Sequence, residues 1–251
     1  MKIRIKFRKY GTMKFIGHLD VMRYFQKAIR RADVDVCYSG GFSPHQIMSF
    51  AAPLGVGITS RGEYVDIEVA STKDSETMKK CLNGVMSEGF EIVSYRGLPD
   101  DAANAMSIVG AGDYTLAFRT GYEPEDMDKE TWFQGLIAFF ERPSVMVTKK
   151  TKRGEKEMDL KPLVYELRIC PEGDGEMEGP RLFMKISAGS AANVKPEQVL
   201  DAYYGFLGKE RPPFAFMVQR EEVYADRASD AEKEAGIHSF ISLEQLGEEI
   251  R

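Results

Sequence analysis

The sequence contains little of what most catalytic or metal sites are made from. Its 251 residues include three cysteines, three histidines and one tryptophan. The cysteines, Cys37, Cys81 and Cys170, lie more than 40 residues apart, so they form neither a closely spaced metal or iron–sulfur motif nor a disulfide framework. We therefore expect no bound metal and no cofactor.

Long apolar runs are also missing. No stretch approaches the roughly 18 consecutive apolar residues that a membrane-spanning helix needs. Residues 1–6 alternate charged and aliphatic side chains, unlike the continuous apolar segment of a secretory signal. We expect a cytoplasmic protein, and the sequence carries no signal for its oligomeric state.

What the sequence does have is an uneven distribution of charge. The formal net charge is −5, but residues 1–31 contain ten Lys or Arg and one acid, for a net charge of +9. The other 220 residues carry 24 Lys or Arg against 38 acids, for a net charge of −14. Such a separation indicates an anionic partner, or a basic surface that the acidic remainder of the chain neutralises.

The first half of the chain alternates strand and helix patterns. Residues 2–8 place aliphatic and charged side chains at alternate positions, which predicts a half-buried strand. A helix is expected over residues 18–32, followed by a strand at 63–69, a helix at 75–87 and a strand at 90–95. The expected order is βαββαβ, the ferredoxin-like arrangement.

Residues 99–112 are small, polar and weakly periodic, which predicts a linker between a domain at 1–98 and a domain at 113–225. An acidic tail, residues 226–251, is expected to pack loosely. The second half repeats the first in its order of elements, with strands expected at 114–119, 145–150, 164–170 or 182–187, and 216–224, and helices at 129–140 and 196–207. The fold class is therefore α+β, with two tandem ferredoxin-like domains that form a pseudo-duplicated pair.

Several short stretches carry a family resemblance. They are Phe15-Ile16-Gly17-His18-Leu19-Asp20, the run of residues 28–32, the Gly/Pro-rich residues 38–45 and 53–57 followed by Glu63, and more thinly residues 158–162 and 189–190. Together they resemble the radical-SAM-linked family, uncharacterised bacterial domains fused to, or encoded beside, cobalamin-type radical SAM proteins. Gly17 and Gln46 depart from the family pattern, which usually has Ser and Pro there. The resemblance implies a radical SAM partner and no particular reaction.

Basic residues are the main candidates for nucleic-acid contacts. On the expected helix, four cations lie opposite the apolar side: Arg23, Lys27, Arg30 and Arg31. The first strand adds Arg4, Lys6 and Arg8, which alternatively pair with Asp66 and Glu68 if the first and third strands are neighbours. A basic loop in the second half adds Lys150, Lys152 and Arg153.

Histidines supply the only catalytic candidates. His18 and Asp20 begin the expected helix, where His18 could act as a base or where both could simply complete the first turn. His45 lies in a Gly/Pro-rich loop that is a candidate binding loop, with Tyr38, Ser39 and Phe42. The alternative is a rigid loop whose histidine hydrogen-bonds to its own backbone.

These features favour a binding protein over an enzyme. The first hypothesis is an RNA-binding accessory protein that presents a tRNA or an rRNA to a radical SAM partner. The second is a metal-independent ribonuclease or RNA-modifying enzyme with His18 or His45 as general base. The third is a protein-only adaptor whose basic face meets an acidic enzyme surface.

Overall fold

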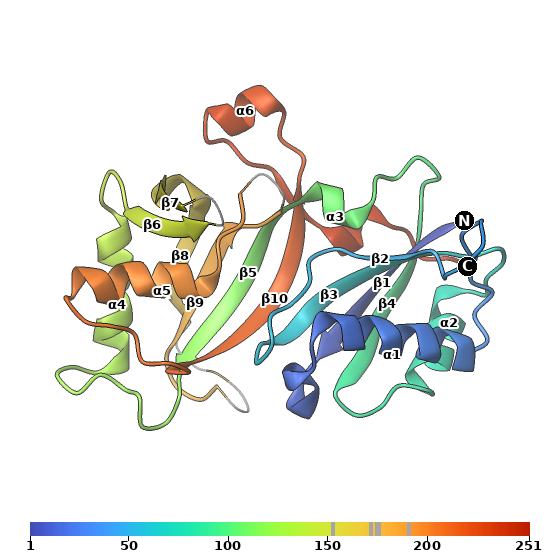
Figure 1. Ribbon diagram of the computed structural model, residues 1–251, viewed down its shortest axis with the longest axis horizontal. Helices are drawn as coiled ribbons and strands as arrows, with labels where there is room; N and C mark the ends of the chain where they lie inside the picture. The colour runs from blue at the N-terminus through green and yellow to red at the C-terminus, as the bar shows by residue number, and fades with distance from the viewer. Residues whose placement is uncertain (152–153, 171–172, 174–176, 190–191) are drawn as a thin grey trace. The chain divides into compact units, whose positions relative to one another are not determined.

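A computed structural model describes residues 1–151, 154–170, 173, 177–189 and 192–251, with residues 149–151, 155 and 156 described by their backbone alone. The chain is a mixed α+β protein whose sheet strands are mostly antiparallel (Figure 1). Its helices are α1 (His18–Arg31), α2 (Ser75–Asn83), α3 (Ala105–Ile108), α4 (Lys129–Phe140), α5 (Pro196–Phe206) and α6 (Asp230–Glu234), with 3-10 turns η1 (Gly11–Phe15), η2 (Lys161–Leu163) and η3 (Leu243–Leu246). None of these helices has the length and apolarity that crossing a membrane requires, within the residues just given.

The strands are β1 (Lys2–Lys9), β2 (Met48–Phe50), β3 (Thr59–Glu68), β4 (Phe90–Leu98), β5 (Val109–Phe118), β6 (Met146–Thr151), β7 (Gly154–Asp159), β8 (Val164–Cys170), β9 (Arg181–Ser187), β10 (Phe216–Asp226) and β11 (Phe240–Ser242). The chain forms two compact units, which we call unit 1 (residues 1–110 and 220–251) and unit 2 (residues 111–219).

The C-terminal segment is an integral part of unit 1. Leu243 is fully buried, and the amide of Ser75 donates to the carbonyl of Ile250 at 3.0 Å. A bridge joins Gly97 to Glu248, so the end of the chain lies along β4. The expected linker also differs, because α3 and the beginning of β5 occupy its second part. The tail is therefore packed and not loose as expected, because its few apolar residues contact residues that are far away in the sequence.

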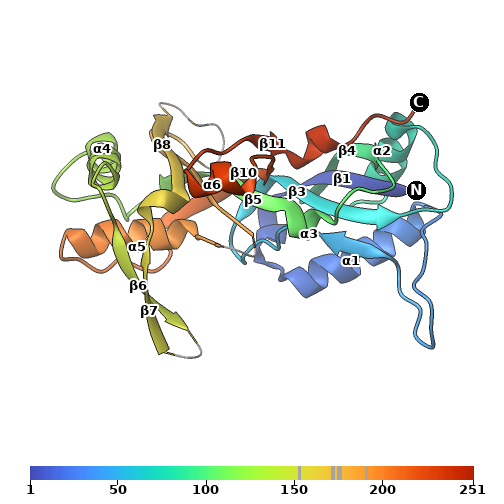
Figure 2. The same ribbon diagram turned by 90° about the horizontal axis from the view of Figure 1, so that it is seen from above.

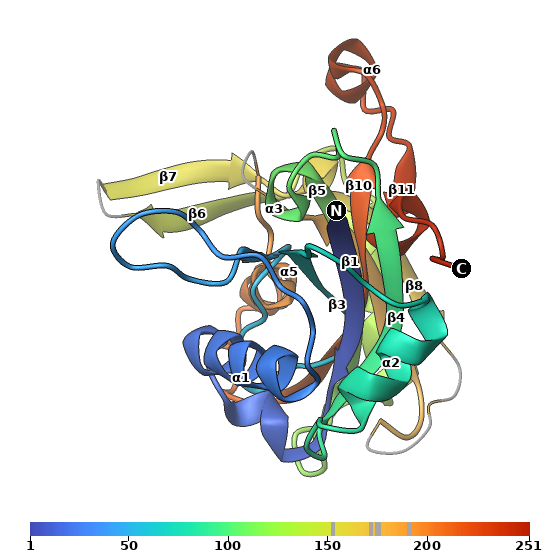
Figure 3. The same ribbon diagram turned by 90° about the vertical axis from the view of Figure 1, so that its right-hand side faces the viewer.

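In unit 1 the strand order is β4-β1-β3, with β2 and β10 also pairing with β3 and β11 pairing with β10. β1 pairs antiparallel with both β3 and β4 (Figure 3), and its register with β3 places Arg4 opposite Asp66. The expectation that the first and third strands are neighbours is therefore confirmed. β1 is a central strand, so both of its edges are satisfied.

Helices α1 and α2 share one core with this sheet. Phe7 of β1 packs against Phe25 of α1 with ring centroids 4.5 Å apart, and Leu82 of α2 belongs to the same buried cluster. The inward positions of α1 begin with Val21, which lies about 160° around the helix from Leu19. Leu19 is consequently 62% exposed, although its apolar side chain was expected in the core.

Unit 2 has the strand order β5-β9-β8 and includes the first four residues of β10, and α4 and α5 contribute large aromatic side chains. Trp132 of α4 packs against Tyr203 of α5 with centroids 4.9 Å apart. The expected start and stop of α5 are both present, since the helix begins at Pro196 and the chain reaches φ +69° at Gly208. Strands β6 and β7 form a separate two-stranded sheet.

Candidate nucleic-acid interface

The cations of β1 lie on the face of the strand opposite the core. Arg4 is 2% exposed, and its guanidinium makes two hydrogen bonds of 2.8 Å with the carboxylate of Asp66. A third bond of 3.1 Å runs from Arg4 to the carbonyl of Leu243 in the C-terminal segment. The pairing with Asp66 is the one that the sequence offered as the alternative to a phosphate contact.

Lys6 is likewise neutralised inside unit 1. Its ammonium lies 2.7 Å from Glu222 and 2.9 Å from Glu244, and its side chain is 12% exposed. Burial lowers the pKa of Lys6, but the bonds and charges of the two carboxylates outweigh burial and hold the pKa above its usual value. The expectation that Arg4 and Lys6 face an external partner is therefore corrected.

The remaining β1 cations near the surface have partners too. Arg8 lies 2.9 Å from Glu91, with 40% of its side chain exposed. Lys2 donates to the carbonyl of Ala102 at 2.8 Å. Only Arg8 is exposed enough to reach an external anion without losing a buried contact.

The cations of α1 are different, because all four are exposed. Arg23 lies 3.4 Å from Asp20, and both side chains are more than 60% exposed. Arg30 and Arg31 donate to main-chain carbonyls, and Lys27 has no ion pair among the residues that the structure describes. An exposed helix pair such as Arg23 and Asp20 contributes little, so this face keeps nearly its full positive charge.

The Gly/Pro-rich loop forms a hairpin that projects beyond α1 and β2 (Figure 2). We call residues 38–46 the hairpin loop. Tyr38 and Gln46 form a bridge at its base, and the amide of Ser39 donates to the carbonyl of His45 at 2.8 Å. The hydroxyl of Ser39 lies 2.8 Å from Nδ1 of His45 and accepts a bond from the amide of His45 at 3.1 Å. Hydrogen bonds within the loop thus fix its base.

The tip of the hairpin loop presents an aromatic ring to solvent. Phe42 is fully exposed and Tyr38 is 51% exposed. Gly41, with φ +98°, provides the left-handed backbone conformation that a tight tip requires. The ring of Phe42 gives up its burial energy in water, and a binding partner that covered the ring would recover that energy.

The structure brings the hairpin loop and the basic face of α1 together. The main-chain carbonyl of Gln26 accepts a bond from Nε of Arg30 and another from Nε2 of Gln46, both at 3.2 Å. Gln46 is 5% exposed, so this contact is part of the packed structure. The contact between Gln26 and Gln46 could not be predicted from the sequence, because 20 positions separate the two residues and a glutamine pair has no motif.

The catalytic candidates have different neighbours. His18 packs edge-on against Phe50 with centroids 5.2 Å apart, while His45 is bonded to Ser39. Gly17 precedes the first turn of α1 without a side-chain cap, and Asp20 faces Arg23 across the surface. The side chain of His45, and not that of His18, lines a cavity of about 410 Å³ beside β2 and β3.

The side chains of the three basic candidates in the second half of the chain are not among those that the structure describes. Lys150 belongs to β6, but its side chain is not among those described, and Lys152 and Arg153 lie outside the described residues. The three cysteines are free, and the described residues contain no group of three His, Cys, Asp or Glu arranged to hold a metal.

Unit 1 also holds a buried ionic cluster that was not predicted from the sequence. Glu63 and Arg220, 5% and 4% exposed, form a hydrogen-bonded pair between β3 and β10. Lys9 is 2% exposed and donates to the carbonyl of Ile16 at 3.1 Å. Burial, together with the charge of Arg220, lowers the pKa of Lys9 despite the opposite effect of Glu63. Each of the three side chains is 5% exposed or less, so the cluster is closed to an external ligand.

Comparison with known protein families gives a match over most of the chain. Residues 2–196 match a family described as "Uncharacterized protein conserved in bacteria (DUF2344)". No curated protein matches the chain. The family match includes β1, α1, the hairpin loop and most of unit 2, and it ends at the first residue of α5. The chain therefore belongs to this family of bacterial proteins.

Proposed function

We propose that unit 1 binds RNA through a helix–hairpin surface, which consists of Arg23, Lys27, Arg30 and Arg31 on α1 and Tyr38 and Phe42 on the hairpin loop. The observation that carries this proposal is the shared contact at the carbonyl of Gln26, which fixes the hairpin loop beside the cations of α1. Cations bind phosphates without reading sequence, and an exposed ring stacks on an unpaired base.

The combination favours single-stranded or looped RNA. A base inside a duplex is not accessible to Phe42, whereas the splayed bases of a loop or a single strand stack readily on aromatic rings. The sheet face of unit 1 is an unsuitable alternative. Arg4 and Lys6 on that face are bonded to Asp66, Glu222 and Glu244, and η3 contacts both of them.

Filter binding over a salt series tests this function. The probes are a labelled 12-nucleotide oligouridylate, bulk bacterial tRNA and a duplex DNA of equal length. We expect the logarithm of affinity to fall with the logarithm of salt concentration at about −0.7 for each phosphate that is neutralised on a single strand, or about −3 for four cations. The Lys209→Ala variant is the matched control, because Lys209 is an exposed cation of unit 2. No binding of either RNA at low salt would contradict the proposal.

The family resemblance supports a finer proposal, in which the bound RNA is presented to a cobalamin-type radical SAM protein. Its support is the resemblance of residues 15–20, 38–45 and 53–57 to domains linked to such proteins. Co-expression with a radical SAM protein of the same host, followed by gel filtration with and without RNA, tests it. Separate elution under both conditions would leave the RNA-binding proposal intact and remove the partner.

One observation favours an RNA-cleaving or RNA-modifying activity as a second candidate. The hydroxyl of Ser39 and Nδ1 of His45 lie 2.8 Å apart at a cavity of about 410 Å³, so a general base has a place to act. The His45→Ala variant should then bind RNA normally and leave it intact, while the wild-type protein shortens or modifies it. Intact RNA after incubation with the wild-type protein would remove this candidate.

A protein-only adaptor is the third candidate: its basic face would meet an acidic enzyme surface, and Phe42 would fill an apolar pocket there. Part of its affinity would come from burial of the ring, so the affinity should fall less steeply between 50 and 300 mM salt than that of an RNA complex, which also releases the counterions condensed on the nucleic acid. The salt series described above therefore separates the two.

We also propose that the two units are repeats of one βαββαβ arrangement. In unit 1, β2, β3, β1 and β4 follow the order β4-β1-β3-β2, with α1 and α2 as the two helices. In the second half of the chain, the corresponding order is β10-β5-β9-β8 with α4 and α5, and the β6–β7 hairpin is an insertion. An experimental structure in which the two sets of four strands and two helices do not superpose would contradict the duplication.

A further inference from the structure

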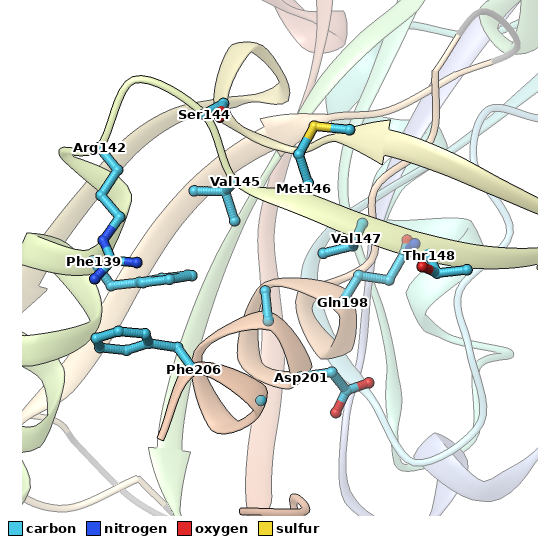
Figure 4. Close-up of a pocket in the computed structure, with 12 residues that line it drawn as sticks. Phe139, Arg142, Ser144, Val145, Met146, Val147, Thr148, Gln198, Asp201 and Phe206 are labelled. Carbon is cyan, nitrogen blue, oxygen red and sulfur yellow. The ribbon is translucent and has the colours of Figure 1, made fainter. Parts of the chain in front are cut away.

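Unit 2 contains a groove between β6 and α5, closed at one end by the last turn of α4 (Figure 4). Its volume is about 550 Å³, which lies within the usual range for ligand pockets. Apolar and small side chains make up much of its lining, from Phe139, Val145, Val147, Ala202, Gly205 and Phe206. The groove plays no part in the RNA surface proposed above, which lies entirely in unit 1.

The floor of the groove leaves room for a ligand because α5 presents small residues to it. Ala202 and Gly205 are three positions apart and so lie on the same side of the helix. A Cβ added to Gly205 would meet no atom within 4 Å, which means that the space beside this position is open. Val147 lines the groove from β6, on the other side from α5. The space between these residues suits the side chains of an extended peptide.

One edge of β6 has no partner strand in the described residues. β6 pairs antiparallel with β7 alone, in a register that places Val147 opposite Met158. The carbonyl of Val145 accepts from the amide of Leu160 on the β7 side. Backbone groups alternate in direction along a strand, so those of Met146 and Thr148 point away from β7. An unpaired strand edge is a template for another strand.

A fixed cation closes one end of the groove. The guanidinium of Arg142 lies 5.1 Å from the ring centroid of Phe139 and 4.1 Å from that of Phe206. The two rings stack on each other with centroids 5.0 Å apart. Among the described residues Arg142 makes no ion pair, and a guanidinium stacked on rings keeps its N–H groups free in its own plane. That plane is suited to a carboxylate, which it binds through two parallel hydrogen bonds.

We propose that this groove binds an extended peptide segment of a partner protein. The segment adds a strand to the free edge of β6, places apolar side chains over Ala202 and Gly205, and bonds a carboxylate to Arg142. The lining disfavours RNA, because Arg142 is the groove's one cation among the described residues, and Asp201 at the opposite end is an acid that already pairs with Arg211 at 2.6 Å. Backbone pairing gives the affinity, and the small floor and Arg142 give the specificity.

Peptide selection with matched variants tests the proposal. A phage library of random nine-residue peptides is selected on the full chain, and the enriched peptides are synthesised with a fluorescent label and titrated by anisotropy. Three variants remove one element each. Thr148→Pro removes the outward N–H without touching the β7 ladder, Gly205→Phe fills the floor, and Arg142→Ala removes the cation. Lys209→Ala is the control, and circular dichroism confirms that each variant is folded.

We expect enriched peptides in which apolar residues alternate and one acid occupies a fixed position. Their affinity should fall at least tenfold with Thr148→Pro and with Gly205→Phe, and about tenfold with Arg142→Ala, while Lys209→Ala binds as the wild type does. No enrichment, or equal affinity for Thr148→Pro, would overturn the proposal. A wild-type dimer in light scattering that Thr148→Pro dissociates would overturn it as well, because the occupant would then be a second copy of the chain. Displacement of the peptide by oligouridylate would assign the groove to RNA instead.

Discussion

Strand β1 and helix α1 follow each other in the sequence and are similarly rich in cations, yet their cations have opposite surroundings in the structure. Arg4 and Lys6 of β1 are buried in bonds to carboxylates, whereas Lys27 and Arg30 of α1 are exposed. The acids that neutralise β1 lie between 62 and 238 positions away. A cluster of charge in a sequence therefore says little about its partner until the distant acids are placed.

The position of each element in unit 1 explains the difference. β1 lies between β3 and β4, so one of its faces packs on the helices and the other meets η3. α1 packs along one side only, and among the described residues the cations of its other side form one ion pair, between Arg23 and Asp20. The comparison makes opposite predictions for the two sets of cations. Those of β1 should stabilise the fold, and those of α1 should bind an external anion.

The largest expected effect is that of Arg4→Ala. The substitution leaves the carboxylate of Asp66, which is 15% exposed, without its charged partner. Removing one partner of a buried ion pair costs about 3–5 kcal/mol, so we expect a loss of this size in the free energy of unfolding, measured by urea denaturation. The matched change on the helix, Lys27→Ala, should alter stability by less than about 0.5 kcal/mol. Equal losses in the two variants would contradict the comparison.

The sequence predicted the regular elements closely where periodicity is local. The alternation of residues 2–8 corresponds to β1, and the amphipathic residues 18–32 correspond to α1 within one residue. The strands left as alternatives in the second half are both present, as β8 and β9. The contacts of the tail could not be predicted. η3 has only four residues, too few to show a periodic pattern, and it is positioned by distant contacts such as the bond from Arg4 to Leu243.

The candidate site was predictable in its parts and not in its assembly. Composition alone identified the exposed cations of α1 and the Gly/Pro-rich loop with Phe42. The contact that joins them, from Gln46 to the carbonyl of Gln26, depends on the path of the chain between α1 and β2. The sequence could not decide whether Arg4 contacts an external phosphate. The alternation of residues 2–8 fits a phosphate-binding face and a strand paired with Asp66 equally well.

The next effect in size concerns the tip of the hairpin loop. Phe42→Ala should weaken oligouridylate binding by about 1–3 kcal/mol, because the stacked base loses its platform. Filter binding at a fixed salt concentration measures this change. Stability should stay within about 0.5 kcal/mol, since the ring is fully exposed and packs on nothing. Phe42→Trp is the matched variant and should bind at least as well as the wild type. Equal affinities of Phe42→Ala and the wild type would show that the hairpin loop takes no part in RNA binding.

The cations of α1 should change the salt dependence more than the affinity at any one salt concentration. The double variant Lys27→Ala/Arg30→Ala removes two phosphate contacts, so the slope of log affinity against log salt should become shallower by about 1.4. Filter binding over the salt series gives this slope. Lys209→Ala removes an exposed cation of unit 2 instead, and this variant should keep the wild-type slope. An unchanged slope in the double variant would place the phosphate contacts elsewhere.

The smallest effect tests the β1 side of the comparison through pH. Burial raises the pKa of Glu244, but the bond and charge of Lys6 outweigh burial and keep the pKa below its usual value. A carboxyl group with a lowered pKa stabilises the fold above its unfolded pKa of about 4.3, and this contribution is lost as the pH falls through the folded value. Glu244→Gln should therefore be less stable than the wild type at pH 7 by less than about 1 kcal/mol, since Glu222 still pairs with Lys6. The difference should shrink as the pH falls from 5 to 3, measured by urea denaturation at each pH. A difference that stays constant over this range would mean that Glu244 contributes packing instead of charge.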